Sequence, residues 1–215
     1  MADDSNRRPL ASRETGWARG ISRRLAATSI TPNQISAASI VAAAIAGICF
    51  WLSGQAETSA RAAFLIAAAL FCQIRLLCNL FDGMVAIEAG KQSSDGAFWN
   101  EFPDRVADNL ILVGVGFGIG NPALGWAAAA LAVLTAYVRE LGRASGQPAD
   151  FSGPMAKPHR MALITAAAIL SLLEPLWHAQ GQLLTVALWG VAIGAAVTAL
   201  RRAVTQVAWL RKPKV

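Results

Sequence analysis

Long apolar segments constrain this chain more than any other feature of its sequence. A bilayer core of roughly 30 Å is crossed by about 20 mostly apolar helical residues, and such segments recur along the 215 residues. We expect six of them: Ile35–Leu52, Ala62–Phe81, Leu110–Ile119 with an extension upstream, Ala123–Val138, Met161–Trp177 and Leu183–Leu200. In hydrocarbon only helices and closed barrels satisfy every backbone amide, and these runs show no alternation of period two. The sequence therefore predicts an all-α integral membrane protein with six transmembrane helices.

Composition and charge agree with this fold class. Hydrophobic residues make up 55% of the chain and charged residues only 15%, whereas about a quarter of a soluble domain is charged. The net charge of +6 needs no nucleic-acid partner, because basic residues gather on the cytoplasmic side of membrane proteins and attract anionic lipid headgroups.

The distribution of basic residues predicts the orientation. With six spans, one side holds Arg7, Arg8, Arg13, Arg19, Arg23, Arg24, Lys91, Arg105, Arg139, Arg143, Lys157, Arg160, Arg201, Arg202, Arg211, Lys212 and Lys214. Only Arg61 falls on the other side, and Arg75 lies inside the second span. By the positive-inside rule both termini are cytoplasmic, and we expect the protein in a bacterial inner membrane.

The N-terminal segment carries a second membrane signal. Apolar side chains recur at helical spacing at Trp17, Ile21 and Leu25, with Arg19 and Arg23 roughly opposite. This pattern predicts a short amphipathic helix on the inner membrane surface; the alternative is a frayed basic tail. We therefore expect three parts: an interfacial segment over 1–30, the six-helix domain over 31–210, and a basic tail over 211–215.

Polar residues concentrate at the inner ends of the second and third spans. Arg75, Asn79 and Asp82 share one helix face, and Asn100, Asp104 and Asp108 share another. A short connection makes these helices antiparallel neighbours, so the two polar stripes can face each other. Facing carboxylates repel unless a cation lies between them, and hard oxygen ligands favour Mg²⁺, Mn²⁺ or Ca²⁺. The alternative is that these are helix-end groups paired with arginines at the interface.

These residues resemble the signature of the CDP-alcohol phosphatidyltransferase family. The family pattern is Asp-x2-Asp-Gly-x2-Ala-Arg-x8-Gly-x3-Asp-x3-Asp, and the chain keeps every spacing without a gap. The matching positions are Asn79, Asp82, Gly83, Ala86, Ile87, Gly96, Asn100 and Asp104. Two of the four aspartates are thus asparagines, and the arginine is an isoleucine.

The resemblance implies a fold, a reaction and a set of residue roles. Family members hold two divalent ions through the aspartates, grip the pyrophosphate of a CDP-linked lipid, and use the last aspartate as the base. Carried over, Asp104 is the catalytic base, and the metal ligands are Asn79, Asp82, Asn100 and Asp104. The pyrophosphate would be bound by Asp82, Gly83, Ala86 and Gly96. The resemblance also implies a homodimer.

The two asparagines limit the metal site. Because they remove two negative charges, divalent binding weakens. Asp108, one helical turn beyond Asp104, can compensate in part as a further metal ligand, and Glu101 adjoins Asn100. We expect one tightly held Mg²⁺ or Mn²⁺, with a second recruited together with the pyrophosphate.

A second basic cluster lies around the fourth and fifth spans. It consists of Arg139, Arg143, Lys157 and Arg160. The family uses basic residues in this region for the acceptor, and arginine forks suit phosphate. We expect these four residues to bind an anionic or phosphorylated alcohol; the alternative is ordinary positive-inside charge.

Three functions are compatible with the sequence. The first is transfer of a phosphatidyl group from CDP-diacylglycerol to a small alcohol, with release of CMP, in phospholipid biosynthesis. The second is a catalytically retired family member that binds lipids or assists assembly. The third is a small transporter, although transporters typically place polar breaks near the membrane midplane, whereas the polar cluster here lies toward one side.

Overall fold

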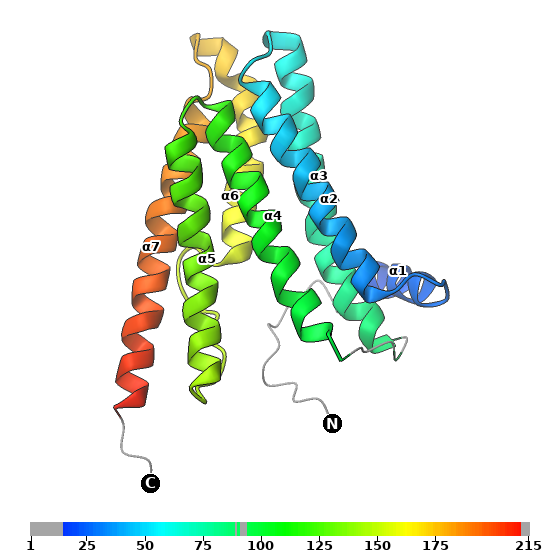
Figure 1. The fold of residues 1–215 in the computed structure, drawn as a ribbon. Helices are drawn as coiled ribbons and strands as arrows, with labels where there is room; N and C mark the ends of the chain where they lie inside the picture. The colour runs from blue at the N-terminus through cyan, green and yellow to red at the C-terminus, as the bar shows by residue number, and fades with distance from the viewer. Residues whose placement is uncertain (1–14, 89, 91–93, 212–215) are drawn as a thin grey trace.

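The computed structural model describes residues 15–88, 90 and 94–211. The expected basic residues Arg7, Arg8, Arg13, Lys91, Lys212 and Lys214 lie outside the described residues. Within the described ranges all regular structure is helical (Figure 1). The helices are α1 (Gly16–Ala26), α2 (Pro32–Ser53), α3 (Thr58–Glu88), α4 (Gly96–Gly118), α5 (Pro122–Ala144), α6 (Lys157–Leu170), η3 (Ser171–Trp177) and α7 (Gln182–Leu210).

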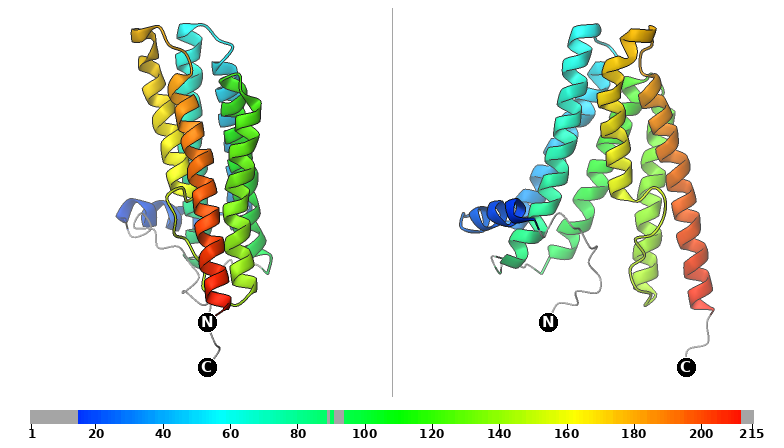
Figure 2. Two further views of the ribbon diagram at one scale, coloured as in Figure 1. Left: turned by 90° about the vertical axis from the view of Figure 1, so that its left-hand side faces the viewer. Right: turned by 180° about the vertical axis from the view of Figure 1, so that it is seen from behind.

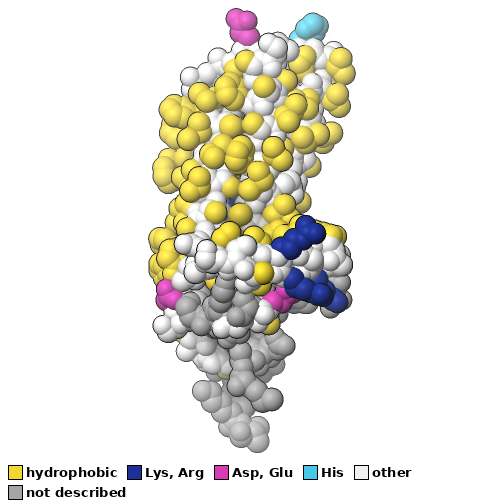
Figure 3. Space-filling model, turned by 90° about the vertical axis from the view of Figure 1, so that its right-hand side faces the viewer, with side chains coloured by type: hydrophobic (Ala, Val, Ile, Leu, Met, Phe, Trp, Pro, Cys, Tyr) yellow, Lys and Arg dark blue, Asp and Glu magenta, His cyan; other side chains and the backbone are white. Residues whose placement is uncertain are grey.

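The expected spans correspond to these helices. Five segments of the described chain are long and apolar enough to cross a membrane: α2, α3, α5, α6 together with η3, and α7. The third expected span corresponds to α4, whose first half carries the charged residues of the polar stripe. Exposed aliphatic and aromatic side chains surround the bundle, and Figure 3 shows hydrophobic side chains over its shaft with basic side chains at the level of α1. The all-helical prediction is confirmed, and the chain is an integral membrane protein.

The two ends of the bundle differ in content. We call the end that holds α1, the last turns of α3 and the start of α4 the α1 end, and the opposite end the η3 end. The helices lie close together at the η3 end and spread apart toward the α1 end (Figures 1 and 2). There α5 and α7 are separated from α2, α3 and α4.

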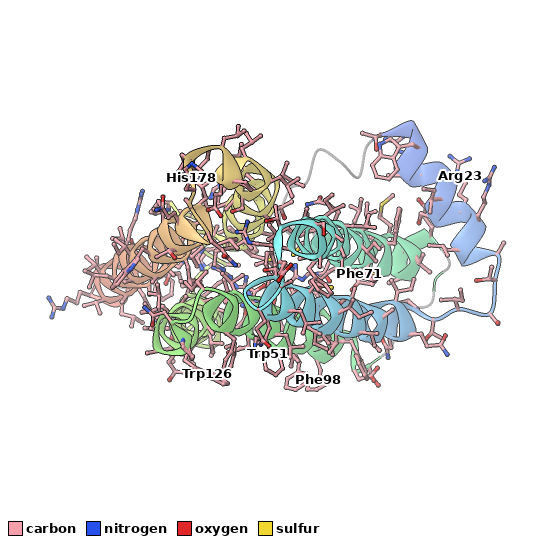
Figure 4. All side chains as sticks on the ribbon, turned by 90° about the horizontal axis from the view of Figure 1, so that it is seen from above. Arg23, Trp51, Phe71, Phe98, Trp126 and His178 are labelled. Atoms are coloured by element: carbon pink, nitrogen blue, oxygen red, sulfur yellow. The ribbon has the colours of Figure 1, made fainter. Side chains whose placement is uncertain are left out.

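Helix α1 lies across the bundle rather than along it. Seen from above, it lies outside the bundle with Arg23 pointing away (Figure 4). One face of α1 contacts the bundle: the Trp17 ring packs edge-on against Phe81 with ring centroids 6.2 Å apart, and Ala18 is buried. The basic residues Arg19 and Arg23 are exposed, so the helix is amphipathic. The predicted helix is present; its position on a membrane surface stays a prediction.

Local signals set the start of α2. Thr31 caps the helix by accepting a hydrogen bond from the Gln34 amide, the Gln34 side chain accepts one from the Thr31 amide, and Pro32 occupies the first helical position. This capping box satisfies two backbone donors that the first turn would otherwise leave free. It fixes where the polypeptide enters the bundle beside α3.

Helices α2 and α4 meet backbone to backbone. A Cβ on Gly47 would lie 2.3 Å from the Leu110 carbonyl oxygen, and a Cβ on Gly114 would lie 2.3 Å from the Gly47 oxygen. The same closeness recurs one level toward the η3 end, between Gly54 and Gly118. Small residues let membrane helices approach closely, so this contact fixes the position of α4, and with it the polar stripe, against α2.

At the η3 end a buried ion pair joins α3 to η3. Arg61 Nη2 lies 2.6 Å from Glu174 Oε2, and the other Glu174 oxygen accepts the Leu183 amide at 2.7 Å. The Gly181 amide also donates to Glu174 at 2.7 Å. Glu174 therefore holds the turn into α7 as well as α3, a role that its sequence position beside Pro175 does not indicate.

The segment between α5 and α6 folds back into the bundle. It runs up beside α5, so that α6 begins partway along the molecule (Figure 2). Arg202 of α7 anchors this segment, donating from Nε to the Ser152 carbonyl at 2.9 Å and from Nη1 to the Thr135 carbonyl at 2.8 Å. Gly153 adopts a φ of +122° there, a backbone conformation that favours glycine. The fold-back brings the first turn of α6 against the polar stripes.

Candidate functional site

The site lies toward the α1 end, where α3, α4 and α6 converge around three buried carboxylates. Asp82 comes from α3, and Asp104 and Asp108 from α4. Three cations accompany them: Arg75 from α3, and Lys157 and Arg160 from α6. The expected juxtaposition of the two polar stripes is therefore present, and α6 adds a third wall.

Asp108 is fully engaged with arginines. Its Oδ1 accepts from Arg75 Nη2 at 3.0 Å, and its Oδ2 accepts from Arg160 Nη2 at 2.7 Å. Arg160 also donates from Nη1 to the Met155 carbonyl at 2.9 Å. Because each Asp108 oxygen faces a guanidinium, the structure places this residue in an ionic tie between α3, α4 and α6. The geometry favours that role over the role of metal ligand expected from the sequence.

Asp104 lies at the centre of the cluster. Its Oδ1 accepts from the Asn79 side-chain amide and from Arg75 Nη2, the latter at 3.2 Å. Its Oδ2 accepts from the Lys157 ammonium and lies 3.8 Å from Arg105 Nη2. So many donors stabilise the charged carboxylate, so Asp104 must lose one of them before it can accept a proton.

Asp82 has a different environment. It is only 8% exposed, and its carboxylate accepts from Ser36 Oγ and from the Gly83 amide, each at 2.6 Å. Within the described part of the chain, no Lys or Arg lies within salt-bridge distance of it. It is nevertheless close enough to Asp104 for the two negative charges to interact. A buried carboxylate with neutral donors and a second carboxylate beside it is a favourable place for a cation.

These observations test whether a divalent ion fits the site. Asp82 and Asp104 supply two carboxylates, and Asn79, whose amide nitrogen faces Asp104, retains its amide oxygen as a ligand. Oxygen donors of this kind suit Mg²⁺ or Mn²⁺. Asp108 is occupied by arginines, Asn100 is exposed, and no group of three or more His, Cys, Asp or Glu among the described residues could hold a metal ion. The residues present fit one divalent ion and lack the charge for two.

The remaining signature positions border the same end. Gly83, Ala86 and Gly96 are half-buried, and Ile87 is exposed. Thus no cation stands at the position where the family pattern has arginine.

The expected acceptor cluster separates into two groups. Lys157 and Arg160 contact the aspartates described above. Arg139 instead pairs with Glu101 and Glu140, and Arg143 lies 2.8 Å from Glu140. The structure therefore brings only one half of the cluster to the site.

Two residues of the site, Ser36 and Arg75, have no role in the sequence prediction, and neither does Arg202, which anchors the segment before α6. Ser36 reaches Asp82 from α2, and no spacing within one helix could reveal a partner 46 residues away. Arg75 was noted as a charge inside a span but received no role. Arg202 carried a signal too, because a buried arginine near the end of a membrane helix needs a partner.

Comparisons with known proteins agree with the signature. No protein-family model matches the sequence. The chain is 27% identical over 194 residues to a phosphatidylinositol phosphate synthase of Mycolicibacterium smegmatis, covering 86% of this chain and 81% of the relative. It is 33% identical over 135 residues to one of Streptomyces avermitilis, covering 59% and 55%.

A solved structure shares the fold. The phosphatidylinositol phosphate synthase of Mycobacterium tuberculosis, in complex with manganese and citrate, matches with a TM-score of 0.75 at 19% identity, over 92% of this chain and 93% of that one. Another structure of that enzyme has CDP-DAG bound.

Fold and site together define a helical integral membrane protein with a polar signature at one end of its bundle. The chain is similar in sequence to phosphatidylinositol phosphate synthases and shares the fold of one of them. It keeps the spacing of the CDP-alcohol phosphatidyltransferase signature, with asparagine at two of the four acidic positions.

Proposed function

We propose that this protein transfers the phosphatidyl group of CDP-diacylglycerol to a small phosphorylated alcohol and releases CMP. The observation that carries the proposal is Asp82: a buried carboxylate without an ion-pair partner in the described chain, at a signature position and beside Asp104. The relatives named phosphatidylinositol phosphate synthase support an inositol phosphate as the acceptor.

The reaction follows from the positions of the residues. The acceptor hydroxyl oxygen attacks the phosphorus that bears the diacylglycerol, a new P–O bond forms, and the P–O bond to CMP breaks with its electron pair leaving on CMP. Asp104 takes the hydroxyl proton once a donor has left its Oδ2. Asp82, Asp104 and Asn79 would hold a divalent ion, which when bound supplies charge neutralisation for the pyrophosphate and the leaving CMP.

The placement in the membrane is part of the proposal. We propose that α4 also spans the membrane, which brings the number of spans to six. Its contact with α2 continues from Gly47 to Gly54, and its second half is apolar. Both termini and the site then lie on the cytoplasmic side of a bacterial inner membrane, as the basic residues favour. On this basis 1–30 is the interfacial segment, 31–210 the membrane domain and 211–215 a cytoplasmic tail. The proposed homodimer can be tested by cross-linking in membranes.

CMP release tests the activity. Purified protein in lipid vesicles with CDP-diacylglycerol, Mn²⁺ and inositol phosphate should release CMP, and Asp82→Asn should abolish the release. Glu57→Gln, which removes an exposed carboxylate near the start of α3 and far along the chain from the site residues, is the matched control and should retain it. Wild-type protein that binds CDP-diacylglycerol but releases no CMP with any of a panel of alcohols would contradict the proposal.

That negative result would support the second candidate, a lipid-binding protein without catalysis. One observation favours it: Asp104 pairs with the cations Lys157 and Arg75 and accepts from the Asn79 amide, which makes it a weak base until a donor moves.

A further inference from the structure

Cations of the chain itself offset part of the negative charge of the site. Asp104 and Asp108 pair with Arg75, Lys157 and Arg160, and Asp104 also lies 3.8 Å from Arg105, whereas Asp82 has no ion-pair partner among the described residues. The family signature has four carboxylates at its acidic positions, and such a set requires divalent ions to offset repulsion. Here asparagines have removed two of those carboxylates, and side-chain cations offset part of the remaining charge. The contacts of Arg75, Arg160 and Lys157 decide which of these cations can also bind a ligand.

The two arginines are committed to the structure. Arg75 and Arg160 are fully buried, and both hold Asp108. Removing either would leave a buried carboxylate short of a partner, which costs several kcal/mol in general. They act as fixed charges in the wall of the site.

Lys157 differs from both arginines. Its side chain remains 23% exposed, and Asp104 is its sole hydrogen-bond partner among the described residues. An ammonium group has three donors, so two remain for oxygen atoms of a ligand. Lysine is a compact charge on a flexible stem, and it can therefore turn from a carboxylate to a phosphate without a change in the helix that carries it.

The position of Lys157 is set by the chain's fold-back. The segment before α6 is held by Arg202 on Ser152 and by the Met155 amide, which donates to Thr198 Oγ1 at 3.0 Å. Lys157 is the first residue of α6 and follows this anchored segment directly. Its ammonium therefore reaches Asp104 of α4 from the first turn of α6.

We propose that the Lys157 ammonium takes the place of one of the two divalent ions that the family signature implies. In the resting site it neutralises Asp104. When the CDP-lipid binds, it turns to the pyrophosphate and frees Asp104 Oδ2 for the proton of the acceptor. This inference rests on the proposed function, and it assigns Lys157 to the pyrophosphate rather than to the acceptor expected from the sequence.

Manganese binding tests the inference independently of turnover. Mn²⁺ is titrated into the full-length protein in detergent and followed by electron paramagnetic resonance. We expect one Mn²⁺ ion per wild-type chain, because the carboxylates offer charge for one. Lys157→Met should bind Mn²⁺ at least about tenfold more tightly, because a competing cation leaves Asp104 and the site gains net negative charge.

Matched variants separate local from general charge effects. Lys157→Arg keeps the cation and should bind Mn²⁺ as the wild type does. Arg201→Met removes an exposed charge from the C-terminal part of α7 and should also leave the Mn²⁺ affinity unchanged. If Lys157→Met does not fold, Lys157→Gln serves the same purpose. In every variant a thermal unfolding curve with EDTA and with Mn²⁺ establishes that the protein is folded.

The outcomes are distinct. Unchanged Mn²⁺ affinity in both Lys157→Met and Lys157→Gln, or two Mn²⁺ ions per wild-type chain, would overturn the assignment even if the protein releases CMP. Tighter Mn²⁺ binding in Lys157→Met, with no CMP released by the wild type, would retain Lys157 as the replacement cation and reject the transferase activity.

Discussion

Replacing Asp108 with asparagine separates the structural interpretation of this residue from the metal-ligand interpretation. Asp108 is 2% exposed and accepts from Arg75 at 3.0 Å and from Arg160 at 2.7 Å. Asparagine keeps the shape and one acceptor oxygen, but it removes the negative charge that two buried guanidinium groups share.

The magnitude follows from these two contacts. A hydrogen bond to a charged group contributes about 1.5–3 kcal/mol, and breaking a buried ion pair by removing one partner costs about 3–5 kcal/mol. Because the asparagine oxygen keeps one weaker bond and Arg75 keeps Asp104, we expect a loss near the lower limit, about 3 kcal/mol. In a chain of this length that corresponds to a fall in the unfolding midpoint of about 6–12 °C.

Thermal unfolding in detergent, followed by tryptophan fluorescence, measures this fall, and Mn²⁺ titration of the same sample should still show one bound ion. Glu57→Gln, which removes an exposed carboxylate, should change the free energy of unfolding by less than about 0.5 kcal/mol. An Asp108→Asn protein that unfolds with the wild type yet loses Mn²⁺ binding would refute the ionic-tie interpretation and restore Asp108 as a metal ligand.

Three other substitutions probe the fold and the site. Gly114→Ala places a Cβ 2.3 Å from a carbonyl oxygen of α2 and should cost about 1–3 kcal/mol in chemical unfolding; Gly20→Ala, with open space around it, should not destabilise, and equal effects would contradict the close packing. Glu174→Gln removes the ion-pair partner of the buried Arg61 guanidinium and should lower the free energy of unfolding by about 3–5 kcal/mol in a thermal unfolding measurement. CMP release per folded molecule should stay normal; its loss would show that the η3 end and the site are coupled. Asp82→Asn removes a buried, unpaired charge, so its unfolding midpoint should equal or exceed that of the wild type, and a large fall would indicate a structural partner for Asp82.

The helices were predictable because their signals are local. Apolar length predicted six spans, of which five correspond to segments of the described chain long and apolar enough to cross a membrane, and the spacing of Trp17, Ile21 and Leu25 predicted α1. The cap formed by Thr31 and Pro32 sets the start of α2 through contacts within its first turn. Each of these depends on residues within one helix or its cap, where periodicity and capping chemistry act directly.

The balance of charges in the site was not predictable in the same way. Helical spacing placed Asn79 near Asp82 and Asp104 near Asp108, and the structure has both pairs on shared faces. It could not show that Lys157 and Arg160 would enter the same cluster, because that depends on how the segment between α5 and α6 folds back under Arg202. Asp108 and Arg160 are 52 residues apart, and only tertiary structure joins them.

The contact between Asn79 and Asp104 also restricts how this site could change. The asparagine amide donates to the carboxylate, whereas an aspartate at 79 would set two acceptors against each other with no proton between them. Restoring the first acidic residue of the signature alone would therefore introduce repulsion before it offered any gain in metal binding. The substitution becomes favourable only in a background where a second cation already sits between the two side chains. Asparagine at 79 is thus entrenched by its neighbours, and a return to the four-carboxylate pattern requires at least two changes in a particular order.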